Sequence, residues 1–217
     1  MNRRILLLFF GVLVMIMTSF NVDKTHASSA DFDWYEDRDG IVIVQYLGTA
    51  KDVVIPETIE GKPVIKIFSR AFSNKGLTSV TIPQTVTDIG SGAFEKNALK
   101  ELHIPSNVKV IGPFAFMDNQ ISKLTFDEGL QHIASAAFSN NKLTAVTFPA
   151  SLQKLKGNAF GGNKILSFTF KGPIELEEDS VGLMVELDGE LVGWYTDQAF
   201  KNKWNGKITG PTTIYSK

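Results

Sequence analysis

The sequence contains no cysteine and only three histidines, His26, His103 and His132. Without thiols the chain cannot form a disulfide, present a thiolate nucleophile or hold a cysteine-ligated zinc or iron–sulfur centre. The histidines lie far apart, and His103 and His132 fall at different positions of an internal repeat, hence on different faces. The sequence therefore predicts no metal and no cofactor.

Long apolar runs are also scarce, and the longest lies at the N-terminus. Two arginines precede an apolar run over residues 5–16, and small residues follow it. This pattern is typical of a secretory signal peptide, cleaved after Ala27 or Ala30. The run is short for a membrane span, which needs about 20 residues. We expect residues 1–27 to be removed and the protein to be extracellular without a stable membrane span, with non-covalent cell-wall association left open.

Positive charge is not concentrated anywhere in the remaining chain. Removing residues 1–27 reduces 22 basic residues to 19 and 23 acidic residues to 22, so the formal net charge is −3. A mildly acidic chain without a basic block argues against nucleic-acid binding. It also lacks the basic amphipathic helix of a membrane-surface protein.

The most informative feature is a repeat of 22 residues. Segments beginning at residues 77, 99, 121, 143 and 165 align without insertion, and the four complete ones read LTSVTIPQTVTDIGSGAFEKNA, LKELHIPSNVKVIGPFAFMDNQ, ISKLTFDEGLQHIASAAFSNNK and LTAVTFPASLQKLKGNAFGGNK. Columns 1, 4, 6, 10, 13 and 18 are apolar in all four. A related segment with five extra residues lies upstream, between Val53 and Phe72. Such a period predicts a solenoid, whose stacked coils bury a core that one coil could not.

Within each repeat, apolar positions 4 and 6 flank a polar position 5, the period of a strand with one buried face. Pro or Asp at position 7 ends this strand. A second short segment, either extended or helical, carries positions 10 and 13. Position 18 is expected to stack from coil to coil and holds Phe94, Phe116, Phe138 and Phe160.

Asparagine recurs at position 21 of every complete repeat, as Asn97, Asn119, Asn141 and Asn163. Asn tolerates the left-handed backbone and bonds neighbouring backbone groups, so a ladder that holds the turn is favoured over a polar binding stripe. Lys75 occupies the same column upstream, so we expect the first turn to differ.

These repeats resemble the BspA-type leucine-rich repeats of bacterial surface proteins. The resemblance rests on the TIP strand ends, such as Thr81 to Pro83, and on the Ile-Gly-x-x-Ala-Phe segments at 89–94 and 111–116. It implies a β-rich fold with little helix, a right-handed leucine-rich-repeat solenoid of five to six coils over residues 55–170. We expect an N-terminal cap over residues 31–54. The resemblance implies a ligand only weakly, because such scaffolds bind many unrelated partners.

Residues 171–217 depart from the repeat. Residues 183–192 predict a hairpin turning at Asp188-Gly189. The strings GWYTD and TTIYSK, with Trp204 between them, resemble the end of a Listeria–Bacteroides repeat, the small β-grasp-like module of internalin-type surface proteins. The usual first strand of that module is poorly matched here. This segment is therefore interpreted either as a cap on the solenoid or as a truncated module.

Candidate binding residues lie on the expected concave, exposed face of the first strand, where repeat proteins commonly bind. They are Ser79, Thr81, Lys100, Glu101, His103, Lys123, Thr125, Thr147 and Thr169. This face has almost no aromatic side chain on which a sugar or base could stack. His103 is the most reactive group in the set. Hydrolysis would require a nucleophile beside it, from Ser79 or Thr125, and a third orienting group. Threonine recurs at position 5 of the repeat, so a threonine beside His103 is expected from the repeat alone and does not indicate catalysis. We expect no enzymatic activity.

Two further features have competing interpretations. An acidic run near residue 35 lacks the spacing of a calcium loop and is interpreted as a solvated cap, with Phe32 and Trp34 covering the first coil. Phe114, beside Pro113 and Val110, is either an exposed apolar spot for a partner or a local repacking.

Export and a solenoid without visible chemistry together favour a secreted, non-catalytic binding module that recognises an extracellular protein or glycan, for example in adhesion. The alternative is a structural spacer or assembly component of the cell envelope. The sequence sets neither the ligand nor the oligomeric state.

Overall fold

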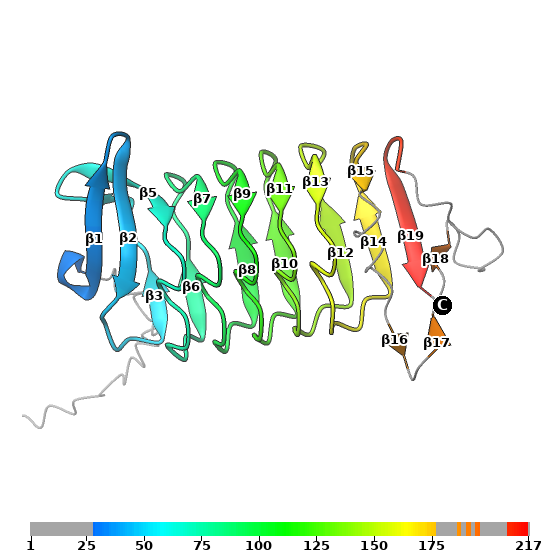
Figure 1. The fold of residues 1–217 in the computed structure, drawn as a ribbon, viewed down its shortest axis with the longest axis horizontal. Coiled ribbons are helices and arrows are strands. Elements are labelled where there is room, and N and C mark those ends of the chain that lie inside the picture. Colours follow the sequence, from blue (N-terminus) through cyan, green and yellow to red (C-terminus); the bar gives the residue numbers. More distant parts are fainter. Residues whose placement is uncertain (1–27, 177–185, 188–189, 192–193, 196–207, 217) are drawn as a thin grey trace, which may run out of the picture.

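The computed structural model describes residues 28–176, 186–187, 190–191, 194–195 and 208–216. The predicted signal peptide, the Asp-Gly turn at 188–189 and the segment up to Trp204 lie outside these residues. Within the described part, the only helix is the 3-10 turn η1 (Ser29–Asp31), and every other element is a strand (Figure 1). The β-rich solenoid of five to six coils is therefore confirmed, whereas the division of the chain into domains stays a prediction.

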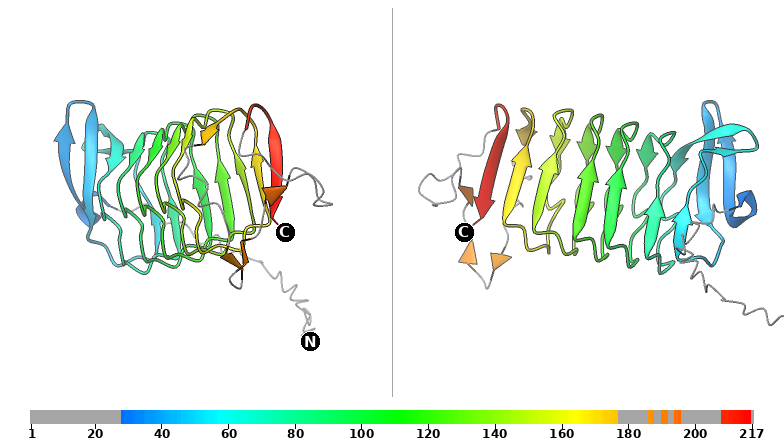
Figure 2. Two further views of the ribbon diagram at one scale, coloured as in Figure 1. Left: turned by 45° about the vertical axis from the view of Figure 1, so that its right-hand side comes forward. Right: turned by 180° about the vertical axis from the view of Figure 1, so that it is seen from behind.

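Each coil contributes two parallel strands, and like strands of successive coils lie side by side (Figures 1 and 2). The strand at positions 3–6 recurs as β6 (Ser79–Thr81), β8 (Glu101–Ile104), β10 (Lys123–Phe126), β12 (Ala145–Phe148) and β14 (Ser167–Phe170). The strand at positions 12–13 recurs as β7 (Asp88–Ile89), β9 (Val110–Ile111), β11 (His132–Ile133) and β13 (Lys154–Leu155). The second segment of the repeat is thus extended, and the helical alternative is wrong.

The positions 12–13 sheet runs without interruption along the solenoid. Its order begins with β1 (Phe32–Asp37), β2 (Gly40–Tyr46) and β5 (Lys62–Ile67). It continues through β7, β9, β11 and β13 to β15 (Glu175–Leu176). Pairing keeps the 22-residue offset, so that Ile89 faces Ile111 and Ile111 faces Ile133. Position 13 is Ile or Leu in each of these strands, so this register stacks aliphatic side chains along the solenoid, while position 12 varies.

The positions 3–6 sheet is split into three ladders, β3-β6, β8-β10 and β12-β14-β19-β18. Three of these strands lie outside the complete repeats: β3 (Asp52–Val54), β18 (Trp194–Tyr195) and β19 (Thr212–Ser216). In the β8-β10 and β12-β14 ladders, the backbone N–H at position 7 of the later coil donates a hydrogen bond to the earlier coil. Asp127 N donates to Ile104 O at 3.0 Å, and Lys171 N donates to Phe148 O at 3.3 Å. Pro105 and Pro149 occupy that position at the two breaks and have no N–H to donate.

One pair of coils escapes this rule. Pro83 also occupies position 7, yet β3 (Asp52–Val54) still pairs with β6, because Ile55 N donates in the opposite sense to Thr81 O at 3.1 Å. The five extra residues of the first coil form a small hairpin between β4 (Thr58–Ile59) and β5 (Lys62–Ile67).

The core is a continuous column that stacked phenylalanines dominate. Phe94, Phe116 and Phe138 are fully buried and Phe160 is 4% exposed. Ring centroids of successive members are 5.1, 5.3 and 5.2 Å apart, and the rings are within 9° of parallel. The small Ala before each Phe is also buried, which allows the coils to approach. The predicted stack is confirmed.

The turn that follows the second strand uses two left-handed residues per coil, at positions 16 and 20 of the repeat. They have φ between 55° and 71° and are Arg70, Gly92, Phe114, Ala136 and Asn158, then Asn74, Lys96, Asp118, Asn140 and Gly162. Left-handed backbone is unfavourable for most side chains, so neighbouring coils must hold it in place. Phe114 is 45% exposed, and local repacking therefore does not bury it.

Side-chain hydrogen bonds of the asparagine column help to hold the backbone conformation of this turn. Asn119 Nδ2 donates to Phe94 O at 2.9 Å and to Phe116 O at 3.1 Å, while its Oδ1 accepts from Leu99 N at 3.1 Å. Asn97, Asn141 and Asn163 repeat these contacts, and all four are at least 92% buried. The predicted turn-holding ladder is confirmed. The first turn, where Lys75 occupies the asparagine column, differs in that Gly76 has a left-handed backbone with φ of 68°.

Both ends of the solenoid are covered by antiparallel strands. At the N-terminus, β1 (Phe32–Asp37) and β2 (Gly40–Tyr46) form a hairpin that buries Phe32, half-buries Trp34 and stacks Tyr46 on Phe72 at 5.4 Å. The predicted cover of the first coil is therefore confirmed. Burial raises the pKa of Tyr46, as does the nearby negative charge of Asp31, while the Ala50 backbone opposes the shift.

At the other end, β19 (Thr212–Ser216) pairs antiparallel with β14, so that Ile214 lies opposite Phe168. β18 (Trp194–Tyr195) continues this sheet, and β16 (Glu186–Leu187) pairs with β17 (Glu190–Leu191), the two strands of the predicted hairpin. The resemblance of this segment to an internalin-type module stays a prediction.

Candidate functional site

Eight of the nine predicted binding residues, at positions 3 and 5 of their coils, share one face of the positions 3–6 sheet, because alternate side chains of a strand point to the same side. We call this surface the strand face. Lys100, at position 2, directly precedes β8. Seven of the residues are exposed: Thr81, Lys100, Glu101, His103, Lys123, Thr125 and Thr147. Ser79 and Thr169 are half-buried, and Thr169 Oγ1 lies 3.0 Å from Thr213 Oγ1 on the covering strand β19.

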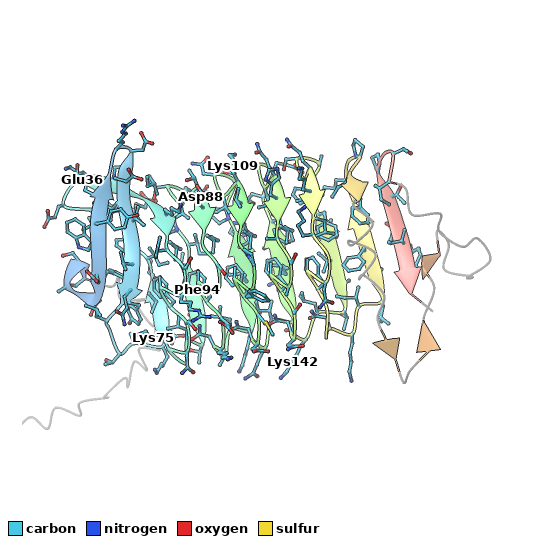
Figure 3. The ribbon with its side chains drawn as sticks, in the orientation of Figure 1. Glu36, Lys75, Asp88, Phe94, Lys109 and Lys142 are labelled. Atoms are coloured by element: carbon cyan, nitrogen blue, oxygen red, sulfur yellow. The ribbon has the colours of Figure 1, made fainter. Side chains whose placement is uncertain are left out.

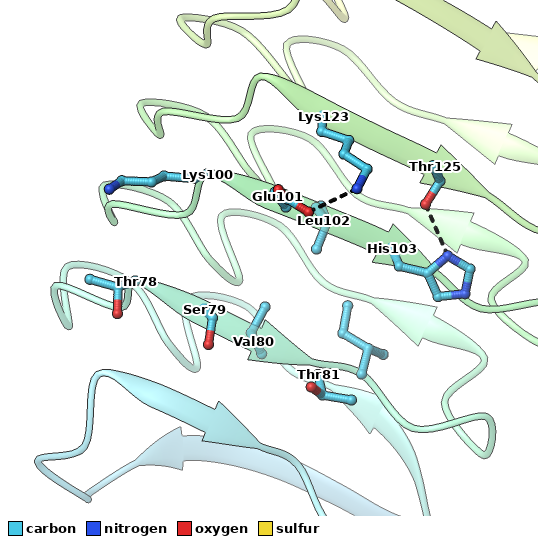
Figure 4. Close-up of a pocket in the computed structure, with 11 residues that line it drawn as sticks. Thr78, Ser79, Val80, Thr81, Lys100, Glu101, Leu102, His103, Lys123 and Thr125 are labelled. Atoms are coloured by element: carbon cyan, nitrogen blue, oxygen red, sulfur yellow. Dashed lines mark hydrogen bonds and ion pairs between the residues drawn. The ribbon is translucent and has the colours of Figure 1, made fainter. Parts of the chain in front are cut away.

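A hollow of about 460 Å³ opens on the strand face where β6 and β8 are not paired. Seven of the nine predicted residues line it, while Thr147 and Thr169 do not (Figure 4). Sequence reasoning missed its apolar lining, which Val80, Ile82 and Leu102 supply. Pro105, which has no N–H to donate, lies at this break between β6 and β8.

Lys123 and Glu101, two of the charged side chains around the hollow, form an ion pair. Lys123 Nζ lies 3.1 Å from Glu101 Oε2, and these side chains are 66% and 68% exposed. Ion pairs this accessible to water contribute at most about 1 kcal/mol to stability. Thr78 and Ser79 donate to Asp52 Oδ1 at 2.6 and 2.9 Å. The pairs therefore fix the side chains in place more than they stabilise the fold.

His103 lies between a hydroxyl and a carboxylate. Its Nδ1 is 3.0 Å from Thr125 Oγ1, and its Nε2 is 3.2 Å from Asp127 Oδ2. Asp127 was missed as a site residue, although the sequence holds a signal for it: it replaces the proline found at position 7 in three of the four complete repeats. The carboxylate thus follows Thr125 by two residues and lies diagonally across from His103.

This arrangement is accessible to water. The side chains of His103 and Asp127 are 55% and 40% exposed, and water weakens the electrostatic interactions that hydrolytic sites concentrate in dry surroundings. Among the described residues, no three His, Asp or Glu side chains converge as metal ligands. No helix in the described part of the chain has the length and apolarity to cross a membrane.

Comparisons with known proteins place this geometry in a family. Six copies of the BspA type leucine rich repeat region match residues 52–180, more than half of the chain. A leucine rich repeat protein from T. pallidum is 31% identical with a TM-score of 0.60, over 66% of this chain and 71% of that one. No curated protein matches the chain.

Two other solved structures match the chain over smaller parts of their own length. A leucine rich cell surface protein from Faecalibacterium prausnitzii is 19% identical, with a TM-score of 0.38, over 80% of this chain and 59% of that one. The pneumococcal vaccine antigen PcpA is 25% identical, with a TM-score of 0.49, over 76% and 38%. On the strength of the repeat match over residues 52–180, the chain belongs to the family of BspA-type leucine-rich-repeat proteins.

Proposed function

We propose that the chain is a secreted, non-catalytic binding module that recognises an extracellular protein or glycan through the hollow between β6 and β8. The observation that carries this proposal is the hollow itself, whose apolar lining of Val80, Ile82 and Leu102 is bordered by charged and hydroxyl side chains. Recessed apolar surface with a few convergent polar groups is the usual composition of a binding site.

Export and the absence of catalysis rest on separate arguments. Export is supported by the charged, apolar and small-residue pattern of residues 1–27. The Thr125–His103–Asp127 arrangement is too exposed to give a hydroxyl nucleophile the dry environment that hydrolysis exploits. A scaffold that presents an ordered polar face without such an environment is suited to recognition.

A pair of matched substitutions tests the hollow. Purified chain is applied to an array of extracellular proteins and glycans, together with Thr81→Tyr and Thr147→Tyr. Both threonines are exposed at position 5 of the repeat, but only Thr81 lines the hollow, and Tyr is well tolerated on strands. We expect Thr81→Tyr to weaken binding to the ligands found at least tenfold and Thr147→Tyr to leave it within twofold. An array without ligands, or equal binding by both variants, would contradict the proposal.

A further inference from the structure

A second surface of the solenoid has an unbalanced charge. It is the edge formed by positions 19–22 and 1–2 of each coil, residues 73–78, 95–100, 117–122, 139–144 and 161–166, together with Lys51, and we call it the turn edge. Its cations are Lys51, Lys75, Lys96, Lys100, Lys142 and Lys164. Its acids are Glu95 and Asp118, so the formal net charge is +4 (six minus two).

The opposite edge of the same coils lacks this excess. Positions 7–12 of the five coils carry four acidic residues and three lysines, a formal net of −1. Figure 3 shows Lys75 and Lys142 along one margin of the solenoid, with Asp88 and Lys109 along the other. The chain from residue 28 onward has a net charge of −3. The excess on the turn edge is therefore a local asymmetry in an acidic protein.

The contacts of these lysines do not neutralise them. Lys51 Nζ donates to the carbonyl oxygen of Lys75, and Lys142 Nζ donates to the amide oxygen of Gln120 at 3.2 Å. Both acceptors are uncharged. Within the described part of the chain, Lys100 and Lys164 have no carboxylate within ion-pair distance. Lys96 lies 3.6 Å from Glu95, the one carboxylate among the described residues within ion-pair distance of a lysine on this edge.

The two acids on this edge are already engaged. The side chain of Glu95 is only 17% exposed and lies beside Lys96. Asp118 Oδ1 accepts a hydrogen bond from Asn140 Nδ2 at 2.8 Å. Asp118 keeps its negative charge, because its partner is uncharged. Six lysines against two carboxylates still leave the turn edge mostly positive over four coil steps, roughly 19 Å at the usual strand spacing.

We propose that the turn edge binds an acidic polysaccharide, a chain with repeated sulfate or carboxylate groups, at a surface that borders the hollow and shares Thr78 and Lys100 with it. Several ammonium groups on flexible stems suit a row of repeated anions, since lysine acts as a point charge without fixed geometry. A nucleic acid fits less well, because the turn edge contains no Phe, Tyr or Trp on which a base could stack.

Dextran sulfate is the probe, with neutral dextran and single-stranded DNA of matched charge beside it. Binding to the intact chain is measured between about 20 and 200 mM salt, where exposed charges become increasingly screened. We expect binding to dextran sulfate that weakens with salt, no binding to neutral dextran, and weaker binding to DNA. No binding to dextran sulfate at low salt, or tighter binding to DNA, overturns the proposal.

Two triple variants with the same loss of charge locate the site. Lys96→Gln with Lys142→Gln and Lys164→Gln changes the turn edge and leaves Lys100 intact, because Lys100 also lines the hollow. The control is Lys109→Gln with Lys154→Gln and Lys171→Gln on the opposite edge.

The turn-edge variant should bind at least tenfold more weakly, with a salt slope smaller by roughly two to three, and the control should change less than twofold. Equal losses in the two triples would overturn the proposal. Melting temperatures confirm that both are folded, and Thr81→Tyr should bind dextran sulfate normally, so failure of the hollow and failure of the turn edge are distinguishable.

Discussion

At the scale of single residues, Phe114 and Phe116 show how strongly the position in the repeat governs a side chain. Phe116 lies at position 18, is fully buried and stacks on Phe94 and Phe138. Phe114, two residues earlier, is 45% exposed and has a left-handed backbone with φ of 59°. The other coils place Arg, Gly, Ala or Asn there, so the fold requires a backbone conformation at position 16 and no particular side chain.

The two phenylalanines should therefore respond differently to truncation. Phe116→Ala removes a ring from the packed column and should lower the free energy of unfolding by about 3–5 kcal/mol, since the coils cannot collapse into the gap. Phe114→Ala should change it by less than about 1 kcal/mol, because the ring is largely in water. Urea denaturation of both variants measures the difference. Equal losses would mean that the column does not govern stability.

At the scale of elements, the 22-residue period predicts the first strand, the phenylalanine column and the asparagine turn. It leaves the segment at positions 12–13 open, because a two-residue strand is too short for alternation to distinguish it from a helical turn. The hollow was also beyond direct prediction. It depends on whether another backbone N–H replaces the donor that a proline at position 7 lacks: Ile55 N donates to Thr81 O in the pair that contains Pro83, whereas β6 and β8 stay unpaired at Pro105.

The turn gives the element-scale prediction. Asn119→Ala removes an acceptor for Leu99 N and a donor to Phe94 O and Phe116 O. Leaving a buried backbone group unpaired costs about 1–3 kcal/mol, so we expect a loss of roughly 2–4 kcal/mol. Asn107→Ala is the control: this asparagine is exposed, and its Nδ2 donates to the Gln84 carbonyl at 2.6 Å. If both variants lost a similarly small free energy of unfolding, the asparagine ladder would not be what holds the turn.

At the scale of the whole molecule, a stack of coils has two ends, and each end exposes apolar side chains and unpaired strand groups unless it is covered. The N-terminal end is closed by the β1–β2 hairpin and the stacking of Tyr46 on Phe72. At the other end β19 lies antiparallel to β14, although the repeats themselves pair in parallel. The reversal stops the stack, because β19 does not present the repeat surface to a further coil.

Removing this cover should change association as well as stability. In Ile214→Asp a carboxylate replaces a fully buried side chain opposite Phe168, and since burying an unpaired charge is costly, β19 should detach and leave the edge of β14 and Phe168 accessible. We expect a lower melting temperature and concentration-dependent association by light scattering. Thr213→Asp is the control on the same strand, since Thr213 is half-buried and faces Thr169. This variant should have the same size in solution as the parent chain. If Ile214→Asp melted and scattered like the parent, β19 would not be what ends the solenoid.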